Sequence, residues 1–424
     1  MRLLYSLAWW LALPLVLARL WLRGRKEPGY RRHLAERFGF YSPPPTRPLL
    51  WVHAVSVGET RAAEPLIDAL LAAYPRHAIL LTHMTPTGRA TGQALYGKHG
   101  ERLRQCYLPY DTNWMVGRFL RYFRPAICIL METEVWPNVM AQCRRHQVPV
   151  ALVNARLSER SLAKAQRLSA LMTEAARSMA CVAAQTEADA QRLRSLGAPH
   201  VAVTGSVKFD VTPPQAAVDK GLAMRALIGA RPVFLCASTR EGEESLILDA
   251  WKEAGSGDAL LLIVPRHPQR FDEVARMAQE RGFAVLRRTA MDDRPAPADV
   301  QVLLGDSMGE MFAYYAACDL AFIGGSLLPL GGQNLIEACA VGKPVLIGPH
   351  TFNFAAVSED AVAAGAALRV GDAGAMVSEA QRLLKEAGQR EAMAERALAF
   401  ARQHRGATAR TMVLLRELIE RRLS

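Results

Sequence analysis

The feature that most constrains the fold is a repeated alternation of short, continuously apolar runs with amphipathic stretches. The β-type runs are Leu49–Ala54, Ala78–His83, Ala126–Met131, Val148–Val153, Cys181–Ala184 and Val201–Val203, followed by Pro232–Ala237, Ala259–Val264, Val300–Leu304, Leu320–Ile323 and Pro344–Ile347. Helical patterns such as Arg61–Ala73 and Leu162–Arg177 lie between them. Strands that are apolar on both faces are typical of parallel sheets covered by helices. The sequence therefore predicts an α/β protein with doubly wound sheets.

The length of 424 residues is too great for one ordinary domain, so we expect two. A segment with paired prolines, Asp210–Pro214, separates the two series of strands. We predict an N-terminal Rossmann-like domain over residues 23–210 and a C-terminal one over 211–385. Helices in 386–424 are expected to pack back on the N-terminal domain. Because such sheets bind ligands beyond the carboxyl ends of their strands, the site is expected in a cleft between the domains.

Residues 1–22 are predicted to form a membrane anchor. The stretch Leu3–Leu22 is almost wholly apolar and long enough to cross a bilayer of about 30 Å as a helix. The residues that follow it are basic, namely Arg23, Arg25, Lys26, Arg31, Arg32 and Arg37. By the positive-inside rule this flank and the rest of the chain lie in the cytoplasm. A signal peptide would need a basic start and a small-residue cleavage site. Pro14 and Arg19 leave open a helix that lies in the membrane interface.

Charge and cysteine usage narrow the partners and the compartment. The formal net charge of +12 points to an anionic partner, such as lipid headgroups, a nucleic acid or a phosphorylated substrate. The seven cysteines contain no C-x-x-C pair and mostly lie in apolar runs, which indicates buried thiols in a reducing compartment. The sequence has no P-loop, no complete G-x-G-x-x-G and no carboxylate cluster at a strand end. We therefore expect neither a metal ion nor a cofactor.

Two turns after strands in the first half carry carboxylates. Ser56-x-x-Glu59 follows the first strand and has the spacing of a capping box, in which serine and glutamate satisfy free amides at a helix start. The alternative is that Glu59 serves as a general base. Glu132 and Glu134 follow the strand that ends at Met131. They either complement a helix dipole or take part in chemistry.

Three turns in the second half have the composition of an anion site. Arg266 and His267 lie between two prolines directly after a strand. The segments Gly305–Met311 and Gly331–Glu337 are glycine-containing turns, and their Ser307-x-x-Glu310 and Asn334-x-x-Glu337 again fit capping boxes. A glycine-rich turn that enters a helix also binds phosphate through free amides. A glutamate one turn into such a helix can accept both ribose hydroxyls.

Taken together, the strand-end motifs resemble those of the Kdo transferases, which attach 3-deoxy-D-manno-octulosonic acid (Kdo) to the lipid A precursor in Gram-negative bacteria. The resemblance rests on His53–Thr60, Met131–Asn138, Asn154–Ser158, Gly205–Asp210, Pro265–Pro268, Gly305–Met311, Gly331–Glu337 and Gly348–Phe354. It runs in order from the apolar N-terminal stretch to the C-terminal region. One departure is Gln333, where the family pattern has histidine.

The resemblance implies a glycosyltransferase of the B type, with two Rossmann-like domains that face a cleft, and an inverting reaction that needs no metal. The donor would be CMP-Kdo and the acceptor the lipid A precursor, lipid IVA, at the cytoplasmic face of the inner membrane; nucleic acid is not a partner. Glu59 would be the general base, and Glu132 and Lys208 would stabilise the transition state. The CMP moiety would be held by Arg266, His267, Met308, Gly309, Glu310, Asn334, Leu335, Ile336 and Glu337.

Two other classes of function fit part of the sequence. Gly305-x-Ser307-x-Gly309 matches the nucleophile elbow of α/β hydrolases, and Asp372 and His404 follow in the order of a catalytic triad. That interpretation leaves the carboxylates at Glu59 and Glu132 unused. A non-catalytic, membrane-bound lipid-binding module would explain the apolar stretch and the charge, but not the strand-end turns.

Overall fold

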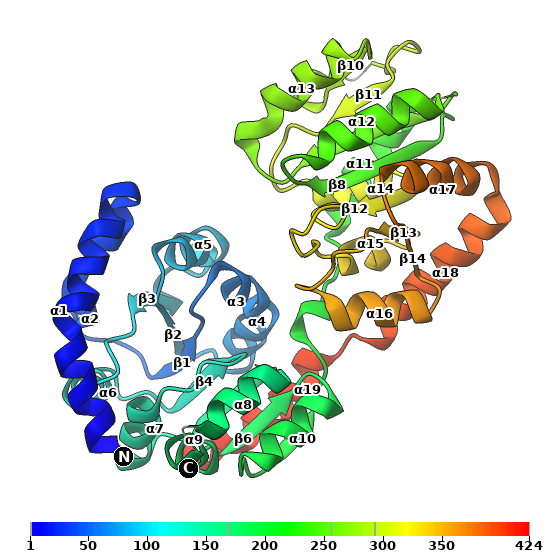
Figure 1. Ribbon diagram of the computed structural model, residues 1–424. Helices are drawn as coiled ribbons and strands as arrows, with labels where there is room; N and C mark the ends of the chain where they lie inside the picture. Colours follow the sequence, from blue (N-terminus) through cyan, green and yellow to red (C-terminus); the bar gives the residue numbers. More distant parts are fainter. Residues whose placement is uncertain (1, 168, 256, 292–293, 424) are drawn as a thin grey trace. The chain divides into compact units, whose positions relative to one another are not determined.

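The computed structural model describes residues 2–167, 169–255, 257–291 and 294–423. The chain divides into two compact units, one made of residues 1–210 and 405–424 and the other of residues 211–404 (Figure 1). Each unit contains its own parallel sheet with helices on both faces. The predicted α/β architecture with two doubly wound sheets is therefore confirmed.

The first unit is built on the strand order β3-β2-β1-β4-β5-β6-β7, and all its strands are parallel. The strands are β1 (Leu49–His53), β2 (Ala78–His83), β3 (Leu103–Tyr107), β4 (Ile127–Met131), β5 (Val150–Ala155), β6 (Cys181–Ala184) and β7 (Val201–Val203). The helices are α1 (Arg2–Lys26), η1 (Pro28–Arg31), α2 (Leu34–Arg37), α3 (Val57–Ala62), α4 (Glu64–Ala73), α5 (Pro86–Tyr96), η2 (Gly97–Arg102), α6 (Asn113–Phe123), α7 (Pro137–Arg145), α8 (Glu159–Arg167), α9 (Ser169–Arg177), α10 (Glu187–Ser195), η3 (Val207–Phe209) and α19 (Ala407–Leu423).

The continuous apolar runs are explained by burial on both faces of this sheet. Leu49 and Trp51 of β1 pack into one core layer, and Leu50 and Val52 pack into the other. Side chains alternate between the two faces of a strand, so both sets must be apolar when helices cover both faces. Every residue of β1, β2, β4 and β5 is buried.

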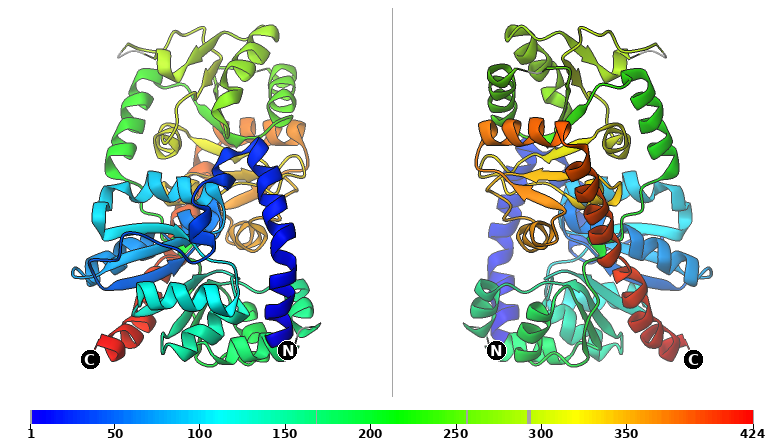
Figure 2. Two further views of the ribbon diagram at one scale, coloured as in Figure 1. Left: turned by 90° about the vertical axis from the view of Figure 1, so that its left-hand side faces the viewer. Right: turned by 90° about the vertical axis from the view of Figure 1, so that its right-hand side faces the viewer.

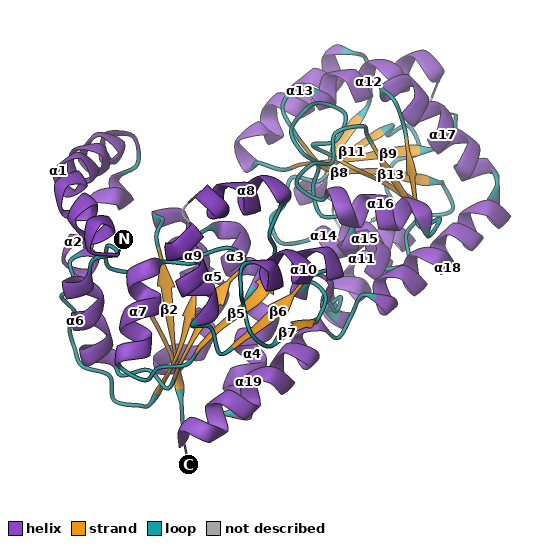
Figure 3. Ribbon diagram, turned by 60° about the horizontal axis from the view of Figure 1, so that its bottom comes forward, coloured by secondary structure: helices purple, strands orange, loops and turns teal. Residues whose placement is uncertain are grey.

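Helix α19 completes the first unit, although it follows the whole of the second unit in the sequence. Met412, Leu415 and Ile419 join the core layer beneath β1, and Figure 3 shows α19 alongside α4. The carboxylate of Asp210 accepts hydrogen bonds from the amides of Gly406 and Thr408. The two passages of the chain between the units are thus held together.

The second unit has the strand order β10-β11-β9-β8-β12-β13-β14, again all parallel. The strands are β8 (Val233–Thr239), β9 (Leu260–Pro265), β10 (Val285–Arg287), β11 (Val302–Leu304), β12 (Leu320–Ile323), β13 (Val345–Ile347) and β14 (Ala367–Arg369). The helices are α11 (Gln215–Ile228), α12 (Glu243–Ala254), η4 (Pro268–Arg270), α13 (Phe271–Glu280), η5 (Arg288–Ala290), α14 (Met311–Ala317), α15 (Ile336–Ala340), α16 (Ala355–Ala363), α17 (Ala373–Lys385) and α18 (Ala387–Gln403).

The division of the chain differs from the predicted boundary at residue 386. Helix α18 belongs to the second unit, because its Met393 packs into that unit's core and its Leu398 lies against Gly342. Only α19 joins the first unit. The predicted helix Leu162–Arg177 is present as two helices, α8 and α9, with residue 168 outside the described residues.

Three strands were absent from the sequence prediction, namely β3, β10 and β14. All three lie at an edge of their sheet. Their side chains are partly exposed at Leu103, Arg104 and Gln105 of β3 and throughout β10. An edge strand needs less apolar surface than a central one, so its composition gives a weaker signal.

Helix α1 is the one helix of the described chain that is long and apolar enough to cross a membrane, over Leu4–Arg25. It is continuous through Pro14 and runs beyond the predicted end at residue 22. Figure 2 shows it in dark blue. A signal sequence can have the same length and composition. Length and composition therefore make α1 a candidate for a membrane anchor and do not by themselves distinguish the two.

Candidate active site

The predicted carboxylates of the first unit lie where the strand order of its sheet reverses. β1 pairs with β2 on one side and with β4 on the other, and the chain proceeds outward from this point in both directions. Such a switch point opens a crevice at the carboxyl ends of the two strands. Glu59 follows β1, and Glu132 and Glu134 follow β4. The topology therefore brings the two sequence-predicted turns together.

Glu59 forms the capping box that its spacing predicts. Ser56 is the N-cap of α3, and its hydroxyl oxygen accepts a hydrogen bond from the Glu59 amide at 3.4 Å. The Glu59 carboxylate accepts hydrogen bonds from the Val55 amide at 2.7 Å and from the Ser56 hydroxyl at 3.0 Å. These bonds fix the carboxylate at the mouth of the crevice, and two oxygens with several lone pairs still leave it able to accept a proton.

The pKa of Glu59 is raised to about 7. Burial is the largest cause, and the neighbouring carboxylates Glu134 and Glu132 raise it further, against the hydrogen bonds from Val55 and Ser56. A carboxylate whose pKa lies near neutral pH is poised to take up a proton. A cap on an exposed helix end would not need such an environment, so the geometry supports more than a capping role.

Glu132 and Lys208 form an ion pair with 2.8 Å between Lys208 Nζ and Glu132 Oε1. Glu132 has a left-handed backbone, with φ of 59°, directly after β4. Lys208 lies in η3, after β7. The structure therefore pairs the two residues to which the family resemblance gives a part in transition-state stabilisation.

Asn154 links these loops, and the sequence prediction gave it no role. Its side chain is fully buried at the end of β5, donates toward Glu132 Oε1 at 3.4 Å and accepts from the Val207 amide at 3.2 Å. Its backbone is left-handed, with φ of 52°. Two signals in the sequence pointed to it, namely a polar residue in an otherwise apolar strand and its place in the run Asn154–Ser158 that resembles the family. Glu134 lies in the same turn as Glu132, as the sequence predicted, and its pKa is raised by burial and by Glu132.

In the second unit the strand order reverses between β8 and β12. The turn after β8 carries Glu243, whose side chain has no exposed surface. Its carboxylate accepts hydrogen bonds from the amides of Arg240 at 2.9 Å, Gly325 at 2.6 Å and Leu327 at 2.9 Å. Glu243 thus ties the glycine-rich turn after β12 to the turn after β8. The sequence prediction missed it, although two adjacent glutamates after an apolar strand were visible.

Arg266 and His267 follow β9, the neighbour of β8. The Arg266 amide donates to the Thr239 carbonyl at 2.9 Å, which fixes the turn against the end of β8. The pKa of His267 is lowered, first by partial burial and then by Arg240, Arg266 and Arg270. Partial burial and the three arginines therefore favour the neutral form of His267.

Glu310 lies within a group of polar side chains after β11. It pairs with Lys220, lies 3.6 Å from Arg288 and accepts a hydrogen bond from Ser307. Burial raises its pKa, but the bonds from Lys220 and Ser307 outweigh that effect, so the pKa lies below its usual range. The adjacent Met308 is exposed, and Gly309 has a left-handed φ of 79°.

The predicted capping box at Ser307 is wrong. Helix α14 begins at Met311 with Glu310 as its N-cap, and the Ser307 hydroxyl instead contacts Glu310 and the Tyr314 hydroxyl. At Asn334 the box is shifted by one residue. Asn334 accepts from the Ile336 amide at 3.1 Å and donates to Glu337 at 3.2 Å, while Leu335 is the N-cap of α15.

The geometry gives no support to a hydrolase triad. Asp372 caps α17 by accepting from the Ala375 amide, and His404 ends α18 with its Nδ1 at 2.9 Å from the Phe400 carbonyl. Ser307 lacks the left-handed backbone found at Glu132 and Asn154. Among the residues that the structure describes, no three His, Cys, Asp or Glu side chains gather as a metal site would require.

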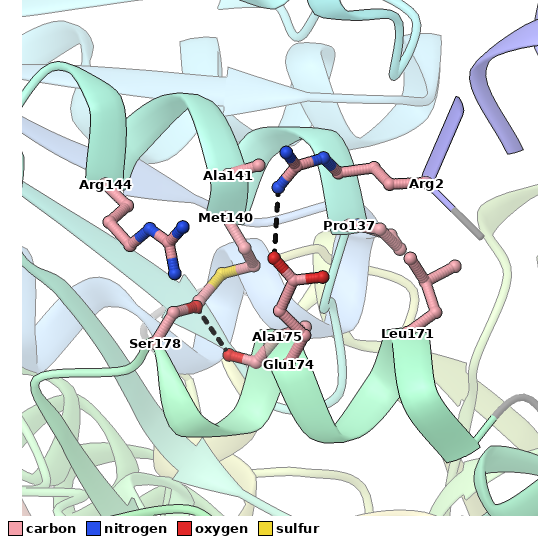
Figure 4. A pocket seen from close by; sticks show the side chains of 9 residues that line it. All are labelled: Arg2, Pro137, Met140, Ala141, Arg144, Leu171, Glu174, Ala175 and Ser178. Atoms are coloured by element: carbon pink, nitrogen blue, oxygen red, sulfur yellow. Dashed lines mark hydrogen bonds and ion pairs between the residues drawn. The ribbon is translucent and has the colours of Figure 1, made fainter.

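A small hollow lies apart from these residues, between α7, α9 and the start of α1 (Figure 4). Its volume of about 10 Å³ is room for a single water molecule, so it does not hold a sugar nucleotide. Figure 4 shows Arg2 of α1 directed at Glu174 of α9 across this hollow.

Comparison with known proteins identifies the family. Residues 32–211 match the family model described as 3-deoxy-D-manno-octulosonic-acid transferase (kdotransferase), and residues 288–400 match glycosyl transferases group 1. A 3-deoxy-D-manno-octulosonic acid transferase from Bordetella pertussis is 47% identical over 97% of this chain and 98% of its own. One from Haemophilus influenzae is 36% identical over 96% of each chain.

The fold has solved counterparts as well. A glycosyltransferase structure from Rickettsia africae covers 88% of this chain and 99% of its own, with a TM-score of 0.58 at 12% identity. That likeness shows the fold alone, which is the B type of two parallel-sheet domains. The sequence identity of 47% and 36% to curated enzymes over nearly the full length shows the family as well. The chain is a glycosyltransferase and belongs to the 3-deoxy-D-manno-octulosonic acid (Kdo) transferase family.

Proposed function

We propose that this enzyme transfers Kdo from CMP-Kdo to the lipid A precursor lipid IVA, with inversion at the anomeric carbon and with Glu59 as the general base. The observation that carries the proposal is the position of Glu59. It lies at the switch point of the first sheet, with a pKa raised to about 7, beside the pair of Glu132 and Lys208.

In the proposed reaction a sugar hydroxyl of the acceptor attacks the anomeric carbon of Kdo. Glu59 takes the proton of that hydroxyl as the new carbon–oxygen bond forms. The bond between the anomeric carbon and the phosphate oxygen breaks, and its electron pair leaves with CMP. A sugar hydroxyl is a poor nucleophile, and a correctly placed base typically contributes about 10²–10⁴-fold to the rate.

Lys208 and Glu132 would act on charge that develops in the transition state. The ion pair holds the Lys208 ammonium group in one position, where it can meet negative charge without reorganisation. Asn154 supports this arrangement because it contacts both Glu132 and the loop that carries Lys208.

The second unit would bind the CMP part of the donor. Arg266 would present a cationic group to the single phosphate, and Glu243 would keep the neighbouring glycine-rich turn in place through the bonds from Gly325 and Leu327. Neutral His267 adds hydrogen bonds. Glu337 would accept the ribose hydroxyls, and the remaining contacts would come from Met308, Gly309, Glu310, Asn334, Leu335 and Ile336. Gln333 keeps hydrogen-bonding capacity but carries no charge that could titrate.

The lipid acceptor places the reaction at a membrane. The apolar helix α1, followed by basic residues, would hold the enzyme at the cytoplasmic face of the inner membrane.

The full-length protein in detergent, supplied with CMP-Kdo and lipid IVA, tests the proposal. We expect a product whose mass exceeds that of lipid IVA by one or more Kdo units, together with free CMP. Release of CMP and free Kdo without a lipid product would contradict the acceptor assignment. No release of CMP at all would contradict the donor assignment.

A further inference from the structure

We propose that α1 lies on the membrane surface, docked along the first unit by one face, and embeds its opposite face in a single leaflet rather than crossing the bilayer. The proposal concerns the attachment of the chain to lipid and goes beyond the transfer reaction. Its partner is an anionic bilayer surface. It rests on the contacts that α1 makes along its length and on the chemistry of the face that it leaves exposed.

The start of α1 is bound to the folded body by polar contacts. Arg2 forms an ion pair with Glu174 of α9 at 3.1 Å (Figure 4). The Tyr5 hydroxyl donates to Asp111 at 2.9 Å, and the Ser6 hydroxyl donates to Asn138 at 3.2 Å. These are specific contacts to the first unit that a helix surrounded by lipid would not make.

The middle and end of α1 are held as well. Leu13 is buried in an apolar cluster with Tyr110 and Met115, and Trp9, Val16, Leu17 and Leu20 pack against the same cluster. Arg31 of η1 donates to the Trp21 carbonyl and stacks over the Trp21 ring, with the guanidinium carbon 4.0 Å from the ring centroid. Contacts thus extend from the first turn of α1 to its last.

The face of α1 that points away from the first unit is almost wholly apolar. It consists of Leu4, Leu7, Ala8, Trp10, Leu11, Pro14, Leu15, Ala18, Arg19, Trp21 and Leu22. Leu11 and Leu15 are 72% and 74% exposed. A soluble helix has its polar side outward, so this pattern is inverted. It is typical of a helix whose outer face lies in lipid.

Charge identifies the kind of lipid surface. Arg23, Arg25 and Arg32 follow or end α1 and are exposed. Trp10 and Trp21 are exposed on its outer face, and tryptophan prefers the level of the headgroups. Basic residues beside an apolar helical face favour a membrane with anionic lipids.

The docked contacts exclude a bilayer crossing. A crossing helix needs about 20 residues within hydrocarbon, which is nearly all of α1. Asp111 and Glu174 would then enter the hydrocarbon with α1, or their bonds to Tyr5 and Arg2 would break. Asp111 is also held by the amides of Asn138 and Val139, so it cannot follow α1 away from the fold. Charged groups within a bilayer are costly, so docking and crossing are mutually exclusive.

A crosslink in native membranes tests the docked position. The full chain carrying Arg2→Cys and Glu174→Cys, two partly exposed positions that form an ion pair, is treated with a short bismaleimide, and the matched control carries Leu11→Cys and Glu174→Cys. The seven natural cysteines are buried, which keeps the background low. We expect crosslinking within the first pair and not within the control pair. Equal crosslinking of the two pairs, or none in the first, would overturn the proposal.

The side of the membrane reached by the start of α1 is the second readout. A protease-cleavable tag placed before Met1 should be cut in inside-out vesicles and protected in intact spheroplasts. The opposite result would show that α1 crosses the bilayer, which would overturn the proposal while leaving the proposed reaction untouched.

The outer face is tested with purified full-length protein and vesicles that contain anionic phosphatidylglycerol. Leu11→Glu with Leu15→Glu should weaken vesicle binding at least tenfold. Leu222→Glu with Leu246→Glu, which adds the same charge at exposed leucines of the second unit, should not. Kdo transfer in detergent should be equal in both variants, so a failed transferase assay is distinguishable from failed attachment. Equal vesicle binding by both would contradict the proposed lipid-facing surface.

Discussion

Glu59 combines a structural role in the cap of α3 with an environment that suits the base role proposed for it. The bonds from Val55 and Ser56 start helix α3 and also fix the direction of the carboxylate. Burial then raises its pKa to about 7. A residue that caps a helix is therefore not excluded from catalysis. The two roles can be separated only by a substitution that keeps one of them.

Glu59→Gln is that substitution. Glutamine also serves at this position of a capping box, so the fold should be kept. The proton acceptor is lost, so we expect turnover to fall by about 10²-fold or more. Below pH about 7, where Glu59 is largely protonated, the melting temperature should change little, and CMP affinity should be unchanged. Steady-state kinetics, calorimetry and a CMP titration measure the three quantities.

The control is Glu101→Gln, which removes an exposed carboxylate elsewhere in the same unit and should be silent. If Glu59→Gln turned over substrate as fast as this control, the base assignment would be wrong and Glu59 would have only a structural role.

The raised pKa of Glu59 also predicts the pH dependence of the reaction. A base must be unprotonated, so kcat/KM should rise with pH through about 7. The free energy of unfolding should instead fall as pH rises. The folded pKa lies above the unfolded one, so the stability contribution is present below pH about 4.5 and is lost as pH rises through about 7. Measuring kcat/KM from pH 5.5 to 9, and melting of wild type against Glu59→Gln, checks both. A flat rate profile between pH 6 and 8 would contradict the assignment.

At the residue level, the sequence predicts those site residues that directly follow strongly apolar strands. Glu59 and Glu132 have this signal. Asn154 lies within a strand, and Glu243 was missed although it follows an apolar strand. The importance of both comes from bonds to loops far away in sequence, such as Val207 and Gly325. Such contacts depend on strand order, which residue patterns do not specify.

Among the elements, the central strands were predicted, and of the edge strands only β7 was. Burial on both faces forces an apolar run in β1 or β8, whereas β3 and β10 carry partly exposed polar residues. Helix starts show a similar limit. A Ser-x-x-Glu spacing correctly predicts the cap of α3. The same spacing gives no cap at Ser307, whose hydroxyl is hydrogen-bonded to the side chains of Glu310 and Tyr314 instead.

Glu243 makes the turn after β12 sensitive to a single change, because its carboxylate accepts from amides in two turns. In Glu243→Gln an NH₂ group replaces one carboxylate oxygen and faces backbone amides, so at least one buried donor loses its acceptor. The free energy of unfolding of the second unit should fall by about 1–3 kcal/mol. CMP binding should weaken as well, since the turn loosens.

Denaturant unfolding and titration calorimetry measure these effects. Glu241→Gln, two residues away and exposed, is the matched control. Unchanged CMP affinity in Glu243→Gln would show that the turn does not contribute to the donor site.

For the whole molecule, the two units have separate cores, and the first depends on α19. Leu415 of α19 is fully buried, so Leu415→Ala should destabilise the first unit by about 2–5 kcal/mol. The second unit should be unaffected. Hydrogen exchange should therefore increase in β1 and α4 but not in β8 and α12.

Val413→Ala on the same helix is the control, because Val413 is exposed. Increased exchange in both units of the Leu415→Ala protein would indicate that they unfold together.

The hydrogen bonds from the amides of Gly406 and Thr408 to Asp210 can form only late in synthesis, which affects the order in which the protein folds. The second unit is an insertion within the first, so a ribosome completes residues 211–404 before it makes α19. Domains generally fold as units during synthesis, the earlier ones first. Here the order is reversed. The unit that carries Glu59 begins first but closes its core last, so residues 211–404 can be folded before that unit receives its last helix.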